Sequence, residues 1–109
     1  MLDYADDCIY SWPMTTTMSK APVLNERAAV FKALGEPTRL RMVEFLRKHR
    51  GEATGRELAE SAGISLALLC HHADALVDAG VVFKRKERQT SYWRINARLL
   101  AELRLYLGG

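Results

Sequence analysis

The chain has 109 residues, of which 49% are hydrophobic and 27% are charged, so it is long enough for one small domain with a modest core. Its two cysteines are too few for a disulfide scaffold, and no apolar run approaches the roughly 18–20 residues that cross a bilayer. We expect a cytoplasmic protein, because the N-terminus is acidic and lacks the apolar segment of a signal peptide.

The net charge of +3 is unevenly distributed along the chain. Residues 1–18 contain three Asp and no Lys or Arg, so residues 19–109 carry a net charge of +6 from 16 basic and 10 acidic residues. A basic body is typical of proteins that bind polyanions, although many other proteins share this charge. Nucleic acid is therefore a candidate partner.

We divide the chain into a flexible N-terminal arm, residues 1–22, and one folded domain, residues 23–109. The arm contains two prolines, three acidic residues and a run of three threonines, which together favour no regular structure. Two internal methionines offer alternative translation starts. The sequence therefore leaves open whether Cys8 belongs to the mature protein.

Two helices are predicted at the start of the domain. The first spans about residues 24–34, with Asn25 as its N-cap and Gly35 in the left-handed conformation after its end. The second spans about residues 37–49, because Pro37 suits a first helical turn. Their predicted inner faces are Ala28, Phe31 and Leu34 in the first helix, with Val30 alongside, and Leu40, Val43 and Leu46 in the second, with Met42 and Phe45 flanking.

Two further helices are separated by a tight turn. Thr54 and Glu57 form a Thr-x-x-Glu capping box that begins the third helix. Ser65 caps the fourth helix, which runs to Ala79 before a terminating glycine. The predicted inner residues are Leu58, Ala59 and Ala62 in the third helix, and Leu69, Ala73, Leu76 and Val77 in the fourth. The outer residues of the fourth are Ala67, Cys70, His71, Asp74 and Asp78.

After the fourth helix the hydrophobic period changes from that of a helix to that of a strand, which predicts a β-hairpin. Its strands are residues 81–86 and 91–96, and its tip is residues 87–90. The hairpin carries a net charge of +4 from Lys84, Arg85, Lys86, Arg88 and Arg94 against Glu87. A last helix, residues 97–107, has a wide apolar face that must be buried against the first helix or a partner subunit.

A helix-turn-helix followed by a basic hairpin is typical of proteins that place a helix in a DNA groove with a β-ribbon beside it. The fourth helix would offer short side chains and backbone N–H groups at its start, and the hairpin would supply cations for phosphates. The predicted DNA contacts are Arg56, Ser65, Leu66, Ala67, Cys70, His71, Lys84, Arg85, Lys86, Arg88, Gln89, Thr90 and Tyr92.

Two alternatives to DNA binding stay open. The hairpin charges also suit a solvated β-edge that is protected against aggregation. Asp74 and Asp78, on a helix without Lys or Arg, would suit a protein-interaction module that has lost its groove. We predict no enzyme, because the sequence contains no recognisable catalytic arrangement or phosphate-binding loop.

Three separated motifs resemble the ArsR/SmtB-type winged helix-turn-helix repressors. They are residues 31–46 (FKALGEPTRLRMVEFL), 69–82 (LCHHADALVDAGVV) and 91–95 (SYWRI), within a resemblance that covers about residues 24–107. The resemblance implies a mostly helical α+β fold of about five helices with a two-stranded wing. It also implies a homodimeric repressor on double-stranded DNA with an inverted-repeat operator, released by an inducer. The implied dimer contacts are Phe31, Leu99, Leu100, Leu103, Tyr106 and Leu107.

The sequence departs from the family at the positions that would sense a signal. Thr54 and Arg56 stand where the family places a Cys-x-Cys metal pair, and no histidine follows His72, so we predict no metal site and no cofactor. A thiophilic metal shared by Cys8 and Cys70 is the alternative.

Cys70 stands where the family commonly has a serine, which suggests a thiol switch. Its place near a helix N-terminus, beside His71 and a basic hairpin, would favour a thiolate. Oxidising Cys70, or bridging it to Cys8, would put bulk on the DNA face. The simpler alternative is a small residue in a serine's position. The inducer, the operator sequence and the target genes are not identified by the sequence.

Overall fold

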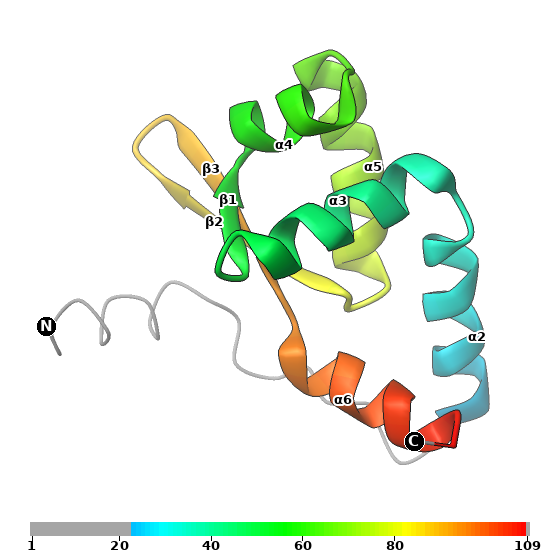
Figure 1. The fold of residues 1–109 in the computed structure, drawn as a ribbon. Helices are drawn as coiled ribbons and strands as arrows, with labels where there is room; N and C mark the ends of the chain where they lie inside the picture. Colours follow the sequence, from blue (N-terminus) through cyan, green and yellow to red (C-terminus); the bar gives the residue numbers. More distant parts are fainter. Residues whose placement is uncertain (1–22, 109) are drawn as a thin grey trace, which may run out of the picture.

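The computed structural model describes residues 23–108, which form five helices and a three-stranded antiparallel sheet (Figure 1). In chain order the elements are α2 (Val23–Leu34), α3 (Pro37–Lys48), β1 (Glu52–Thr54), α4 (Gly55–Ala62), α5 (Leu66–Asp78), β2 (Val82–Glu87), β3 (Thr90–Ile95) and α6 (Ala97–Tyr106). This order confirms the predicted fold class. The predicted arm, residues 1–22 with Cys8, lies outside the described residues.

Capping groups confirm most of the predicted helix starts. Pro37 lies in the first turn of α3, and the Glu36 carboxylate before it accepts two backbone N–H bonds. Thr54 and Glu57 form the expected reciprocal capping box at α4. The Ser65 hydroxyl accepts a backbone N–H of the first turn of α5 at 3.1 Å. Each cap satisfies a donor that has no partner inside the helix.

Two details at the helix ends were wrongly predicted. α2 begins at Val23, so Asn25 lies inside the helix and is not its N-cap. Gly35 is not in the left-handed conformation, which Gly63 and Gly80 adopt after α4 and α5 with φ angles of 71° and 83°. The chain therefore passes from α2 to α3 without the left-handed residue that follows α4 and α5.

One hydrophobic core joins all the helices to the sheet. Its largest fully buried side chains are Trp93, Met42, Leu46, Leu58, Leu69, Leu76, Val30, Val81 and Val82. The predicted inner faces of α4 and most of α5 are confirmed, as are Val43 and Leu46 of α3, but Ala28, Phe31 and Leu40 were wrongly predicted to face inward and are exposed. Val30 is buried while Phe31 is 40% exposed, and Met42 is buried while Leu40 is 47% exposed. Apolar residues cover more than one face of both helices, so periodicity alone does not fix which face turns inward.

The predicted hairpin is present with a shorter turn than expected. Only Arg88 and Gln89 link the strands, because Glu87 pairs with Thr90. The third strand, β1, was not predicted, since three residues are too few to show an alternating pattern. Because β1 pairs with β3, β3 is the central strand of the sheet. β1 runs directly into α4, so its pairing with β3 connects the wing to the start of α4.

α6 lies near the start of α2, away from α4 and the wing tip (Figure 1). The Arg27 guanidinium of α2 lies 3.9 Å from the centre of the Tyr106 ring of α6. Leu99 and Leu103 are 3% and 5% exposed and fill the core of this chain, which corrects their prediction as dimer contacts. No helix within residues 23–108 is long and apolar enough to cross a membrane.

Candidate nucleic-acid interface

The first turns of α5 present an exposed face to solvent. Leu66, Ala67 and His71 are exposed, and Cys70 is half-buried on the same side of the helix. Ser65 is exposed at the N-cap, where the unpaired N–H groups of the helix start lie. The structure therefore brings together the five residues of this segment that were predicted to contact DNA.

The opposite side of α5 contains a buried histidine, for which the sequence analysis predicted no role. His72 is 9% exposed, and its Nδ1 accepts a hydrogen bond of 3.0 Å from Arg39 Nε of α3. Val77, which was expected in the inner face, is only half-buried. Apolar periodicity cannot find a buried polar residue whose partner lies on another helix, so the sequence carried no signal for this pair.

Cross-strand register sorts the cations of the wing onto two faces. Lys84 pairs with Trp93, whereas Arg85 pairs with Tyr92. Paired residues share a face and successive residues alternate, so Lys84 and Lys86 lie on the face of Trp93. Both lysines are exposed, and the Lys84 ammonium lies 5.5 Å from the centre of the Trp93 ring. Their charges are therefore available to a partner on this face.

Arg85 is held on the other face by groups of its own chain. Its Nη2 lies 3.2 Å from Glu52 Oε2, its Nη1 lies 2.7 Å from Glu87 Oε1, and its Cζ lies 4.3 Å from the centre of the Tyr92 ring. Burial lowers the pKa of Arg85, but the hydrogen bond to Glu87 and the charge of Glu52 outweigh burial and raise it. Two carboxylates balance this guanidinium, and its Cζ lies over the Tyr92 ring, so a phosphate contact by Arg85 would compete with partners of its own chain.

The wing tip and the start of α4 complete the surface. Arg88, Gln89 and Thr90 are exposed, and Arg88 has a φ of 60°, which few residues other than glycine adopt. Arg56 is exposed in the first turn of α4. Among the described residues, no carboxylate forms an ion pair with Arg56, Lys84, Lys86 or Arg88. We refer to these four as the free cations.

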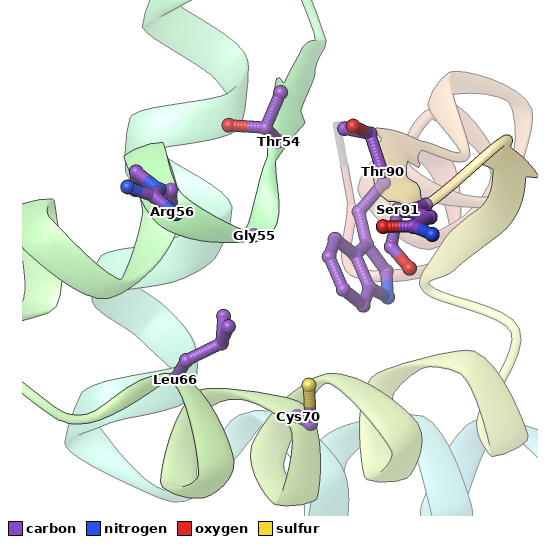
Figure 2. A pocket seen from close by; sticks show the side chains of 9 residues that line it. Thr54, Gly55, Arg56, Leu66, Cys70, Thr90 and Ser91 are labelled. Atoms are coloured by element: carbon purple, nitrogen blue, oxygen red, sulfur yellow. The ribbon is translucent and has the colours of Figure 1, made fainter.

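A cavity of about 430 Å³ separates the wing from α5 (Figure 2). Figure 2 shows the Cys70 sulfur pointing into it from α5, with Leu66 beside it and Thr54 and Thr90 across the gap. The lining residues are Thr54, Gly55, Arg56, Leu66, Cys70, Gln89, Thr90, Ser91 and Trp93. A Cβ on Gly55 would lie 2.9 Å from Trp93 Cζ3 and 3.1 Å from Leu66 Cδ1, so glycine permits this close approach.

The residues considered for metal binding do not converge. Within residues 23–108, no three His, Cys, Asp or Glu side chains are placed to hold a metal ion. Cys70 is a free thiol that lines the cavity, whereas His72 is turned toward α3. The suggested partner Cys8 lies outside the described residues.

An exposed helix start beside a cationic β-hairpin defines a protein of the winged helix-turn-helix, nucleic-acid-binding class. The family model "Bacterial regulatory protein, arsR family" matches residues 36–84. The transcriptional repressor SdpR of Bacillus subtilis is 32% identical over 73 residues, which cover 67% of this chain and 79% of SdpR. The chain belongs to the ArsR family of bacterial regulatory proteins.

Two other relatives agree with this assignment. The "Probable mercury resistance operon repressor" of Streptomyces lividans is 37% identical over 76 residues, or 70% of this chain. The matched segment spans only 59% of the length of that repressor. The solution structure of the homodimeric winged helix-turn-helix DNA-binding domain Mb0332 from Mycobacterium bovis has a TM-score of 0.65 at 29% identity, covering 87% of this chain and 90% of that domain.

Proposed function

We propose that this protein is a dimeric, sequence-specific transcriptional repressor that acts in the cytoplasm by placing α5 in the major groove of operator DNA. The observation that carries the proposal is the position of the free cations on both sides of the exposed start of α5. Cations without carboxylate partners favour a polyanion, and the N–H groups at a helix start favour phosphate. The named relatives are regulators, so we propose binding and not catalysis as the activity.

The dimer would form through α2 and α6. Exposed apolar side chains on these helices are Leu24, Phe31, Leu105, Tyr106 and Leu107. Several large apolar groups on neighbouring helices are typical of a surface that a partner covers. A two-fold dimer would present two copies of α5 to inverted half-sites about one helical turn apart. The relative Mb0332 is homodimeric, which supports the proposal of a dimer.

Within this complex α5 would contribute base recognition and little electrostatic attraction. It contains no Lys or Arg, and Asp74 and Asp78 are exposed on it. Leu66 and Ala67 suit contact with thymine methyl groups, and His71 can hydrogen-bond to base edges. Attraction to the phosphates would come from the free cations.

Selection from a random duplex pool, followed by fluorescence anisotropy at several salt concentrations, tests this function. We expect an inverted-repeat sequence to be enriched and to bind with a steep salt dependence. Each neutralised phosphate contributes about −0.9 to the log–log slope, so four free cations per protomer give a dimer a limit of roughly −7. Failure to enrich or bind any duplex would favour the protein-interaction module instead.

We further propose that modification of Cys70 releases the DNA. Attack of the Cys70 thiolate on a peroxide oxygen breaks the O–O bond, forms a sulfenic acid and releases hydroxide. The added oxygen, or any larger adduct, would occupy the cavity between α5 and the wing, where the Cys70 sulfur points (Figure 2). A thiophilic metal ion is the second candidate, since one relative is named for mercury resistance.

Peroxide treatment of matched variants tests this release. Unmodified protein should lose its selected duplex on oxidation and regain it with added thiol, whereas Cys70→Ser should bind in both conditions. Cys8→Ser reports whether a disulfide between the two cysteines is needed. A full peroxide response in Cys70→Ser would eliminate Cys70 as the sensor.

A further inference from the structure

Arg39, at the start of α3, joins three helices through its guanidinium. Its Nε donates to Nδ1 of His72 in α5 at 3.0 Å, and its Nη1 donates to the carbonyl of Ala33 in α2 at 3.4 Å. His72 is buried on the side of α5 opposite the cavity, and its ring lies 5.4 Å from the ring of His71. The residue next to the anchored imidazole is therefore the one expected to contact bases.

The hydrogen bond specifies the protonation state of His72. Nδ1 accepts only if it carries a lone pair, so the imidazole must be neutral with its proton on Nε2. Protonation would place an N–H at Nδ1 against the N–H of Arg39, which abolishes the bond and sets two positive groups together. A buried polar group that loses its partner destabilises the arrangement that holds it.

We propose that Arg39 and neutral His72 are positioning residues for DNA recognition. The pair fixes the rotation of α5 against the α2–α3 junction, and this rotation sets where His71 and the first turns of α5 meet the groove. Protonation of His72 releases the helix from this position, so acidification weakens specific DNA binding. The proposal rests on the proposed DNA-binding function.

Charged groups of α3 lie around His72. The Arg39 guanidinium is in direct contact with His72, and the Glu36 carboxylate at the start of α3 is the acidic group near it. Glu36 already accepts two backbone N–H bonds of its own helix. Within residues 23–108, neither α4 nor β2, which also pack on α5, places an ion pair or hydrogen bond on His72.

A proton on the exposed His71 would add a cation to the DNA face and mask the effect expected from His72. The test therefore compares His71→Gln with the double variants His71→Gln/His72→Asn and His71→Gln/His72→Leu. Asn offers an amide oxygen near the position of Nδ1 and does not titrate, whereas Leu offers no acceptor. Binding to the selected duplex is measured between about pH 8 and about pH 5, the range in which imidazoles change charge.

We expect His71→Gln to lose about 10-fold or more in affinity as the pH falls, which corresponds to the loss of one buried hydrogen bond. The Asn double variant should keep the affinity of its parent at high pH and show a flat profile. The Leu double variant should bind weakly at every pH while remaining folded by circular dichroism. A merely structural role would give neither the flat profile nor the rescue by Asn.

A pH profile in the Asn double variant that matches its parent would overturn the positioning role alone. So would full-affinity binding by the Leu double variant. Absence of duplex binding by the unmodified protein at high pH would instead overturn the proposed function, and the positioning role with it.

Discussion

The wing and α5 form opposite sides of one surface but differ in their chemistry. The wing carries three of the free cations, Lys84, Lys86 and Arg88, whereas α5 carries exposed apolar groups, one exposed histidine and two acidic residues. Cations attract any duplex, because every sequence has the same phosphates. Apolar and hydrogen-bonding groups distinguish base edges. The difference therefore indicates that affinity is concentrated in the wing and specificity in α5, and each prediction below tests this division.

The largest effect is expected from removing the wing cations. The triple variant Lys84→Ala/Lys86→Ala/Arg88→Ala should bind DNA about 100-fold or more weakly at moderate salt, with the log–log salt slope reduced by roughly 5 for a dimer. Fluorescence anisotropy at several salt concentrations, on selected and unrelated duplexes, measures both the affinity and the slope. The loss should be similar for the two duplexes.

A control with the same charge change is available on the rest of the surface. Arg47, Lys48 and Arg104 are exposed near the ends of α3 and α6. Their replacement by Ala should change the slope much less. Equal losses in the two triple variants would mean that attraction comes from overall charge and not from the wing.

The second-largest effect is expected at Gly55, which lies close to Trp93 of the wing and Leu66 of α5. Gly55→Ala should destabilise the fold by about 1–3 kcal/mol, since the added Cβ overlaps the Trp93 ring in a packed region. Urea unfolding at one fixed protein concentration measures this. Gly35→Ala is the matched control, because its Cβ would approach other atoms no closer than 3.4 Å. Equal stability of the two variants would show that the side chains around Gly55 can move to make room for the added Cβ at little cost.

A smaller effect is expected on the specificity side. His71→Ala should weaken binding to the selected duplex by about 10-fold and leave binding to unrelated duplexes unchanged. The salt slope should also stay the same, because no phosphate contact is removed at neutral pH. If His71→Ala lowers the affinity for both duplexes equally, α5 does not carry the specificity proposed for it.

The smallest effect concerns the support of α5 at the start of α3. Burial raises the pKa of Glu36, but hydrogen bonds from the backbone N–H groups of Thr38 and Arg39 outweigh it, so the pKa lies below its ordinary value of 4.5. A carboxylate with a lowered pKa stabilises the fold at pH values above its ordinary pKa. This stabilisation is lost as the pH falls through the pKa of the folded state. Glu36→Gln should therefore lower the melting temperature slightly at neutral pH. The difference in melting temperature between Glu36→Gln and the unmodified protein should shrink in acid. A difference that grows in acid would contradict the lowered pKa of Glu36.

The sequence by itself determined the elements whose signals are local. Pro37, the capping pair Thr54 and Glu57, and Ser65 each act within a few residues of the helix start that they specify. The change of hydrophobic period likewise located the hairpin to within one residue at each strand end. The exposed residues at the start of α5 followed from these boundaries, so most of the candidate interface was predictable.

Only the tertiary structure decided which charges are free and how α5 is held. Glu52 and Arg85 are 33 residues apart in the sequence, as are Arg39 and His72, and neither pair has a local pattern. The register of β2 on β3 turns Arg85 toward carboxylates and its two lysine neighbours away from them. The inward faces of α2 and α3 likewise depend on the helices packed against them. These features arise from contacts between distant segments, and local periodicity and capping carry no information about such contacts.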